Sequence, residues 1–558
     1  MLVLRDVLNE AYRDLRSRSS SSRPVLVQVG PDADAICACA IWTALLRIDQ
    51  IPYRITPIQS YDHVGAGLAT ADSLVLINCG ATVDLQQHLE AGGAGPDLRV
   101  YVLDSHRPYH LANVRSTNTQ IVCLDATTEY PSYPSDHDLS SDSDDDDGDG
   151  DRRRERIQRR MRVADHYGGT YQDVSVAVLA HDLAQQLGKD DVDMLWAAIV
   201  GLTDQYVFER INRWTYQTQV HHLRRHVFNQ DERDDIGAVD DEAQVRLPAA
   251  GTITFEPADL QFTLLRHWNL YDAMAHSRRL ATRLKLWRDT GTQQLNLILA
   301  KLGIPRQESR APYFLMRYDC KKRLNDDLAK YAGEYGLESA DLFLPGFTRR
   351  YADGLVVSSS DLVLVMTAVL SDSSADNGFW TALDALRLQQ APLLRKTLLP
   401  AAIDLQTKLF QRAHALLSKR GVTSTGKYRL CILDSSEVQY VFGRPLALWQ
   451  LGLFLIDAYE HVISEQSSAQ RKRPRRVKIL PFVLCAEIEQ RHSYLVIGMP
   501  RADQHDQDKI QRNPFAVAFT DAAVLTKARA RQDGFEAAIV EIAADDLKPF
   551  LESLVHQM

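Results

Sequence analysis

A series of short apolar runs in the N-terminal part of the chain limits the fold most strongly. The first of them, Val25–Val29, ends at Gly30-Pro31 and has the pattern of a buried strand. Helical patterns or turn residues separate it from similar runs at 53–58, 74–77, 100–103 and 121–124. Asp34 stands where it can cap a helix that continues through Ile48. Short apolar strands alternating with helices predict an α/β fold with a doubly wound parallel sheet.

The pattern changes further along the chain. Residues 262–302 carry apolar side chains at helical spacing and are expected to form one long helix. Strand and helix patterns alternate again in the last part. We therefore expect an N-terminal α/β domain over 1–230, a mainly helical insertion domain over 231–395 and a C-terminal α/β domain over 396–558.

A low-complexity segment interrupts the N-terminal domain. Residues 136–151 are rich in Asp and Ser, and a run of arginines follows from Arg152 to Arg162. Consecutive Asp side chains repel one another and cannot bury a core, so we expect a disordered insertion over 131–165 that leads into the start of a basic helix. A solvated surface loop would explain such a charge run, and a regulatory or partner-docking role is the alternative.

Composition excludes several classes of protein. The 558 residues carry a formal net charge of −9, so no general basic surplus draws the chain to duplex DNA or to an anionic membrane. The 7 cysteines are scattered, several lie in apolar runs, and no CxxC pair suggests zinc. No apolar run approaches the ~18 residues needed to span a bilayer. We expect a soluble intracellular protein with no membrane partner.

A basic run at 471–476 allows two interpretations. It fits a nuclear localisation signal. A solvated loop before the next strand explains it equally well.

Polar residues stand where the strands of the expected sheet should end. The segments are Asp32-Ala33-Asp34, Asn78-Cys79-Gly80, Asp104-Ser105-His106 and, after a later helical run, Asp204. Ligands bind at the carboxyl edge of such a sheet. Each segment alone is ordinarily a helix cap or a turn, but that explanation does not account for their occurrence together in this order.

In this order the segments resemble the motifs of the DHH phosphoesterase superfamily, which includes the RecJ exonucleases. The resemblance implies two Mn²⁺ or Mg²⁺ ions clamped by carboxylates. However, Asn78 stands where the superfamily has aspartate, and Ser105 stands in place of its first motif histidine. We therefore expect no catalytic residue, no cofactor and no metal, only a vestigial site formed by Asp32, Asp34, Asn78, Asp104, Ser105, His106 and Asp204.

Nearly the whole chain resembles the cell division control protein 45 family, a degenerate eukaryotic relative of RecJ. The matching pieces include 34–39, 76–81, 104–108, 195–205 and 265–272, and Asn78 is part of the family pattern. The resemblance implies a DHH-like N-terminal domain and a DHH-associated C-terminal domain. It also implies a nuclear, non-catalytic subunit of the replicative helicase. Its partners would be the Mcm hexamer, the GINS complex, single-stranded DNA, and other replication initiation and polymerase-linking factors.

Two other functions are weighed against this one. An active metal-dependent phosphoesterase or 5′ exonuclease on single-stranded DNA is the alternative, and Asn78 and Ser105 discriminate against it. A stand-alone single-strand-binding protein is disfavoured by the negative net charge and by the lack of a clear basic-aromatic stripe.

The helical insertion domain is expected to be a docking surface. Aromatic and arginine side chains are enriched where proteins bind proteins, which makes Arg266, His267, Trp268, Arg278 and Arg279 candidates for partner contacts. The alternative is that Trp268 belongs to the core and that the cations are simply solvated.

Overall fold

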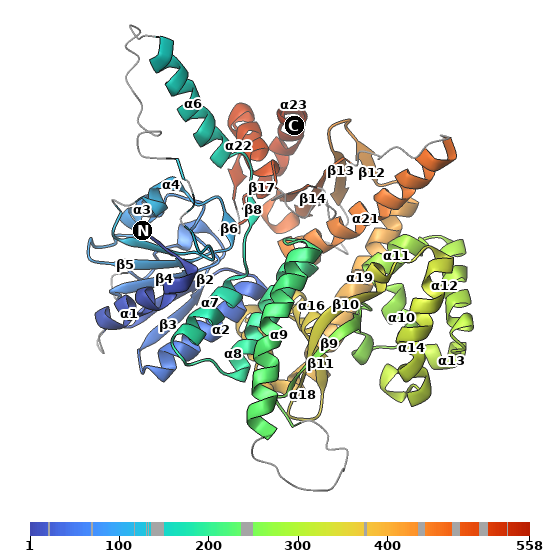
Figure 1. Cartoon of the computed structure of the whole chain (residues 1–558). Helices are drawn as coiled ribbons and strands as arrows, with labels where there is room; N and C mark the ends of the chain where they lie inside the picture. The colour runs from blue at the N-terminus through green and yellow to red at the C-terminus, as the bar shows by residue number, and fades with distance from the viewer. Residues whose placement is uncertain are drawn as a thin grey trace. The chain divides into compact units, whose positions relative to one another are not determined.

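The computed structural model divides into two compact units, Met1–Asn212 with Ala502–Met558 (unit 1) and Arg213–Arg501 (unit 2) (Figure 1). It describes residues 1–19, 23–68, 71–115, 118–129, 131, 133–134, 150–235, 249–372, 377–433, 441–470, 480–500, 512–532 and 534–558. The acidic residues 136–149 and the basic run 471–476 lie outside the described residues. The three domains expected from the sequence divide the chain at other positions than these two units, and that division stays a prediction.

Unit 1 contains the expected parallel sheet. Its six strands lie in the order β1 (Leu2–Val3), β7 (Ile121–Leu124), β5 (Arg99–Leu103), β4 (Ser73–Ile77), β2 (Val25–Val29) and β3 (Tyr53–Pro57). All neighbouring pairs are parallel. The chain places β3 on one side of β2 and β4 on the other, so the carboxyl ends of β2 and β4 border a topological switch point, where such sheets bind ligands.

Helices cover both faces of this sheet (Figure 1). On one face α2 (Ala33–Ile48) contacts β2 and β4 and packs against α7 (Val176–Gln186) and α8 (Val192–Val207), with α1 (Leu8–Arg18) beside α7. On the other face Leu74, Leu76 and Val100 pack with Leu85 and Leu89 of α3 (Leu85–Ala91) in one buried cluster. The doubly wound arrangement expected from the sequence is confirmed.

The last segment of the chain completes the core of unit 1. Phe535 belongs to the same buried cluster as α3, and its ring meets the ring of Tyr61 edge-on at 4.9 Å between centroids. The backbone N–H of Gly534 donates to the carbonyl oxygen of Gln59 at 2.9 Å. Nearby, α22 (Phe515–Thr526) packs on α23 (Leu547–Gln557), and β16 (Ala530–Arg531) pairs with β17 (Ile539–Ala543). Residues from both ends of the sequence therefore build one core.

The start of α2 differs from the expectation. Its N-cap is Asp32, which has an extended backbone. The side chain of Asp32 accepts a hydrogen bond from the N–H of Ala35 at 2.8 Å, as an N-cap residue does. Asp34 lies inside the first turn of α2 and is fully buried, so it is free to cap a different helix.

The basic part of the low-complexity insertion is helical. Helix α6 (Gly150–His166) starts where the acidic run ends, so the disorder expected over 131–165 does not extend to its arginines. The end of α6 is anchored: Nε2 of His166 lies 2.9 Å from the carbonyl oxygen of Tyr109, and the hydroxyl of Tyr167 accepts from the N–H of Leu111 at 3.1 Å.

Unit 2 combines strands and helices. An antiparallel sheet holds β11 (Val356–Ser358), β10 (Phe343–Arg350) and β9 (Ile253–Leu260), while β12 (Val422–Ser424), β13 (Arg429–Leu433), β14 (Phe482–Ile488) and β15 (Ser493–Met499) pair in sequence order. The helices include α9 (Arg213–Asp235), α10 (Leu270–Ala275), α11 (Arg278–Leu284), α12 (Asp289–Lys301), α13 (Arg306–Arg310), α14 (Tyr318–Tyr331), α16 (Ser359–Ser371), α17 (Gly378–Ala385), α19 (Leu399–Ser418) and α21 (Pro445–Gln470).

The single long helix expected over 262–302 is wrong. The structure divides this stretch into a 3-10 turn at Leu265–His267 followed by α10, α11 and α12. Leu264 and Lys285 adopt positive φ angles of 51° and 55°, which interrupt helical geometry. Asn269 starts a new helix by accepting from the N–H of Asp272 at 2.8 Å. Apolar spacing alone did not reveal these breaks.

One described helix segment, Pro445–Ile463 of α21, is long and apolar enough to cross a membrane by length and composition. No uninterrupted apolar run marks it in the sequence, because Gln450, Asp457 and Glu460 lie among its apolar residues. This helix packs against α11, α16 and α19 and against β14 and β15, as a core helix does. All 7 cysteines are buried and free, which confirms their expected role as small core residues.

Candidate functional site at the carboxyl edge of the parallel sheet

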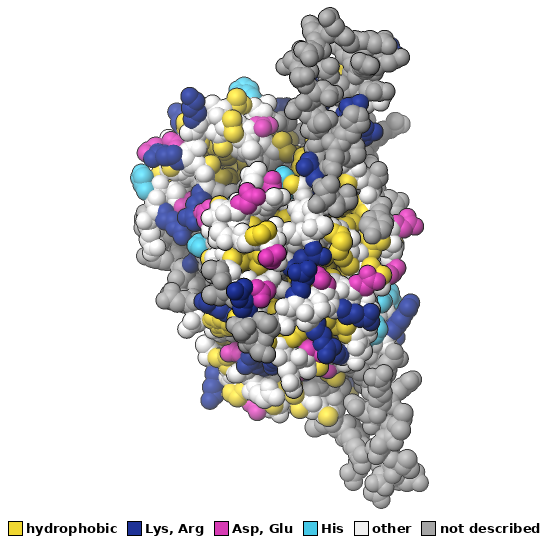
Figure 2. All heavy atoms as spheres, turned by 90° about the vertical axis from the view of Figure 1, so that its left-hand side faces the viewer, with side chains coloured by type: hydrophobic (Ala, Val, Ile, Leu, Met, Phe, Trp, Pro, Cys, Tyr) yellow, Lys and Arg dark blue, Asp and Glu magenta, His cyan; other side chains and the backbone are white. Residues whose placement is uncertain are grey.

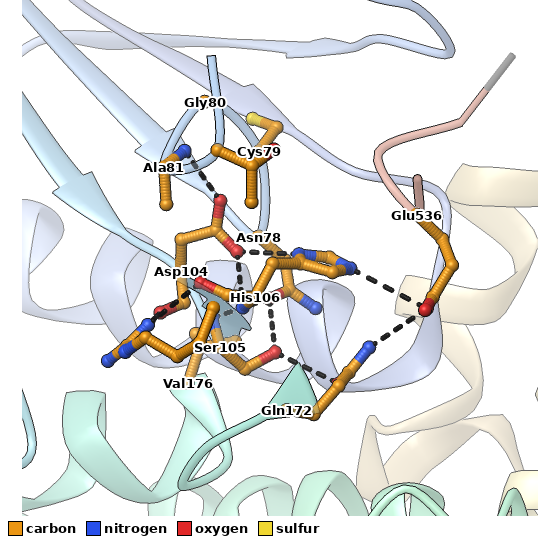
Figure 3. Close-up of polar contacts among 12 residues, drawn as sticks. Asn78, Cys79, Gly80, Ala81, Asp104, Ser105, His106, Gln172, Val176 and Glu536 are labelled. Atoms are coloured by element: carbon orange, nitrogen blue, oxygen red, sulfur yellow. Dashed lines mark hydrogen bonds and ion pairs between the residues drawn. The ribbon is translucent and has the colours of Figure 1, made fainter. Parts of the chain in front are cut away.

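The polar residues that follow β2, β4 and β5 form one hydrogen-bonded group at the carboxyl edge of the sheet (Figure 3). The side-chain amide of Asn78 donates to both carboxylate oxygens of Asp32 at 3.0 Å each. Its carbonyl oxygen accepts from the N–H of Ser105 at 3.0 Å and from the hydroxyl of Ser105 at 2.7 Å. Asn78 therefore links the ends of three strands, and it uses both halves of its amide to do so.

The backbone at this point also favours asparagine. Asn78 has a φ of +54°, in the left-handed region that Asn tolerates better than most residues. A Cβ on Gly30, at the end of β2, would lie 2.9 Å from the carbonyl oxygen of Asn78. The ends of β2 and β4 thus approach each other too closely for a side chain at Gly30.

Asp104 and His106 form a second part of the group (Figure 3). One oxygen of Asp104 accepts from the N–H of Ala81 at 2.9 Å, and the other accepts from the N–H of His106 at 2.9 Å and lies 2.6 Å from its Nδ1. The Nε2 of His106 lies 3.9 Å from the carboxylate of Glu536. The amide of Gln172, on β8 (Tyr171–Gln172), donates to Glu536 at 3.1 Å. This network connects the sheet edge to the C-terminal segment of unit 1.

The neighbouring carboxylates change the titration of His106. Burial of the imidazole opposes its charged form, but attraction to Asp104 and Glu536 outweighs burial and raises the pKa of His106 above its usual value. Protonated His106 is therefore a stabilising cation between two carboxylates.

A His106→Gln variant is expected to lose a contribution to stability that is strongest at acidic pH. Because the folded-state pKa is raised, this contribution is fully present below the unfolded pKa of about 6.5 and is lost as the pH rises through the folded pKa. The melting temperature of the variant should therefore fall further below that of the wild type at about pH 6 than at about pH 8.5. His221→Gln, at an exposed position of α9, is the control. A deficit that does not change with pH would contradict the assignment.

Asp34 caps a helix from inside another one. Its carboxylate accepts from the hydroxyl of Ser175 at 2.5 Å and from the N–H groups of Val176 and Ala177 at 3.0 Å each, at the start of α7. A Cβ on Gly201 of α8 would lie 2.5 Å from the Cβ of Ala177 and 2.6 Å from Oδ1 of Asp34. The helices α2, α7 and α8 meet around this carboxylate, and only glycine fits at position 201.

Asp204 lies on α8 and is also buried, and its carboxylate accepts from Nη1 of Arg210 at 2.9 Å. Burial, with Asp32 nearby, raises the pKa of Asp34 to about 7 against the opposing hydrogen bonds. Burial outweighs the attraction of Arg210 and likewise raises the pKa of Asp204 to about 7, with Asp32 and Asp34 adding to the shift. Asp204 therefore lies close to the carboxylates of the sheet edge.

The residues present do not fit a pair of divalent ions. Both oxygens of Asp32, Asp34 and Asp104 already accept hydrogen bonds from protein donors. Asn78 presents N–H groups to Asp32 where a bridging anion would be required. Within the described ranges, no group of three or more His, Cys, Asp or Glu side chains is arranged to hold a metal ion.

Several members of the site were not found from the sequence. They come from parts of unit 1 that are far apart in the sequence. These are Gln172 on a short strand, Ser175 at a helix cap, Arg210 in a loop and Glu536 in the C-terminal segment. No local pattern marks them, since their role arises from contacts with residues distant in the chain. Arg107 lies within the matching piece 104–108, but the sequence pattern assigned it no role. It pairs with Asp125 at 2.9 Å and with Asp173 at 3.1 Å.

The candidates for partner contacts in the insertion lie in unit 2 and interact with other parts of that unit. Arg266 pairs with Asp259 at 2.6 Å, and His267 lies 3.7 Å from Asp361. The ring of Trp268 stacks on His276 at 4.7 Å, Arg278 lies 3.5 Å from Asp457, and Arg279 is half-buried. Their role in docking stays a prediction.

Comparisons with known proteins agree with the resemblance seen in the sequence. The family model described as CDC45 matches residues 25–156, 134–378 and 371–557. The cell division control protein 45 homolog of Homo sapiens is 29% identical over 573 residues, which cover 96% of this chain and 97% of the human protein. The crystal structure of CDC45 from Entamoeba histolytica shares 23% identity and a TM-score of 0.70 over 100% of this chain and 99% of that one. RecJ from Thermus thermophilus in complex with Mn²⁺ shares 14% identity and a TM-score of 0.41 over 99% of this chain and 54% of that one. The chain belongs to the cell division control protein 45 family.

Proposed function

We propose that this chain is a non-catalytic subunit of the eukaryotic replicative DNA helicase. Membership of the family implies a role in DNA replication and the cell cycle. In this proposal the chain joins the Mcm hexamer and the GINS complex in the nucleus. It contacts single-stranded DNA within that assembly and meets other replication initiation and polymerase-linking factors.

One observation carries the non-catalytic part of the proposal. Protein donors occupy the carboxylates at the sheet edge, and the amide nitrogen of Asn78 faces both oxygens of Asp32. A two-metal phosphoesterase needs anionic oxygens there to hold ions that activate water and clamp phosphate. Here the same edge is a closed hydrogen-bond network that fixes strand ends and helix starts.

The distribution of surface charge supports single-strand contact within an assembly rather than by the chain alone. On the face shown in Figure 2, Lys and Arg side chains are interspersed with Asp and Glu. Tight, sequence-independent binding of single strands requires a cationic groove that follows the phosphates. A mixed surface on a chain of net charge −9 provides less of this attraction.

The purified chain is expected to leave 5′-labelled single-stranded DNA intact in the presence of Mn²⁺ or Mg²⁺. RecJ serves as the positive control, with products separated on a denaturing gel. Hydrolysis that depends on Mn²⁺ and disappears in an Asp104→Asn variant would overturn the non-catalytic assignment. The helicase assignment is tested by reconstitution. The chain should co-elute with purified Mcm hexamer and GINS, and failure to co-elute would contradict the assignment.

A further inference from the structure

Three large side chains are strongly exposed on one side of unit 2. Phe314 and Leu315 lie on a 3-10 turn (Tyr313–Leu315), and Tyr318 starts α14. Phe314 is 70% exposed, Leu315 is 65% exposed and Tyr318 is 76% exposed. Single exposed apolar residues are common, but three neighbouring ones of this size are typical of an interaction surface. We call them the 314–318 surface.

Hydrogen bonds hold this surface in place. The N–H of Tyr313 donates to the carbonyl oxygen of Trp268 at 2.8 Å, and Nζ of Lys321 donates to the carbonyl oxygen of Phe314 at 3.0 Å. Arg317 donates to the carboxylate of Glu308 through its backbone N–H, Nε and Nη2, at 3.2, 3.0 and 2.8 Å. The backbone of the turn is therefore already ordered, which lowers the entropic cost of binding a partner.

The core of this region is complete without the exposed side chains. Met316 and Cys320 lie beside them in sequence and are buried, 4% and 7% exposed. The turn thus directs some apolar residues inward and presents the others to the outside. Phe314, Leu315 and Tyr318 keep most of their surface outside this core.

Charge indicates which partner fits. The exposed charged residues between 306 and 323 are mostly basic. They are Arg306, Arg310, Arg317, Lys322 and Arg323. Asp319 is the exposed acidic residue between 306 and 323, and Asp326 follows on α14. Glu308 pairs with Arg317, so these two charges offset each other. This stretch is therefore positive on a chain whose net charge is −9.

We propose that the 314–318 surface docks an acidic amphipathic segment of a partner protein. The apolar side of that segment covers Phe314, Leu315 and Tyr318, and its carboxylates meet the surrounding Arg and Lys side chains. A protein segment fits better than single-stranded DNA, because Leu315 has no aromatic face for a base to stack on. The proposal goes beyond the helicase function, since it names a contact chemistry that does not depend on Mcm or GINS.

The test selects short random peptides displayed on phage against the full-length chain. A Phe314→Asp/Leu315→Asp double variant is used for counter-selection, because it removes the apolar centre and introduces repulsive charge. Peptides enriched on the wild type should combine Asp or Glu with aromatic or aliphatic residues. Enrichment of basic peptides, or no enrichment over the double variant, would overturn the proposal.

The affinity of an enriched peptide is then measured by fluorescence anisotropy. The double variant should bind it about tenfold more weakly or worse, as expected for loss of central anchors. Leu297→Asp, at another exposed apolar position (57% exposed, on α12), should bind it like the wild type and controls for general loss of surface apolarity. Unchanged melting temperatures establish that the variants are folded. Equal binding by wild type and double variant would overturn the proposal, as would displacement of the peptide by oligo(dT).

Discussion

Replacing Asn78 with aspartate is expected to destabilise unit 1 by about 3 kcal/mol or more at neutral pH. The substitution removes the amide nitrogen that donates to both oxygens of Asp32 at 3.0 Å and places a second carboxylate against it in a buried site. Two carboxylates at this distance cannot both be ionised without a cation between them. The melting temperature, followed by calorimetry, should fall by several degrees.

The same variant should recover at acidic pH. Once protonated, the carboxyl group introduced at position 78 can donate to Asp32 in place of the lost amide, so the deficit relative to wild type should shrink as the pH falls. Asn296→Asp, on the exposed side of α12, is the matched control and should change stability by less than about 0.5 kcal/mol. An Asn78→Asp variant as stable as wild type at neutral pH would show that the amide does not hold the strand ends together.

Replacing Arg107 with methionine is expected to cost about 3–5 kcal/mol, because it leaves the buried carboxylate of Asp125 without its cation. Arg107 is 5% exposed, and its guanidinium pairs with Asp125 at 2.9 Å and Asp173 at 3.1 Å. It also donates to the carbonyl oxygen of Asp104 at 2.6 Å and lies 4.0 Å from the centre of the Tyr109 ring. Methionine replaces the apolar stem but none of these contacts.

The control for Arg107 is Arg23→Met, which removes a surface pair. Arg23 lies 2.7 Å from Asp72, but its side chain is 56% exposed, so the loss should stay below about 1 kcal/mol. Urea denaturation of both variants should separate them clearly. Similar midpoints for the two would mean that the buried pair of Arg107 with Asp125 adds no more than a surface ion pair does.

Most of the sheet of unit 1 was predictable, because β2, β4, β5 and β7 are short, buried apolar runs. The two-residue strand β1 was not predicted. β2 and β7 match their predicted bounds, and the polar residues after β2, β4 and β5 meet as the parallel order requires. Burial on both faces leaves such strands with a continuous apolar signal. The position of Asn78 between Asp32 and Ser105 follows from this order.

Other parts of the structure have no local signal. The sequence predicted Asp34 as the N-cap of α2, but Asp32 caps this helix. Which aspartate caps α2 depends on the backbone angles there and on Ser175 and Val176, which bind Asp34 and are far away in the sequence. The helix break at Lys285 comes from the left-handed backbone of this one residue, and no glycine or proline marks the position in the sequence. Gln172 and Glu536 join the site only through tertiary contacts.

Phe535 packs against Tyr61, although the two residues are synthesised far apart in time. The sheet of unit 1 leaves the ribosome long before Phe535, and all of unit 2 is synthesised between them. Until the final segment emerges, the face carrying Tyr61 lacks its last apolar partner and is open to aggregation or to chaperones. A premature stop codon before Phe535 would therefore remove the C-terminal part of unit 1 and would also expose the core beneath its N-terminal sheet.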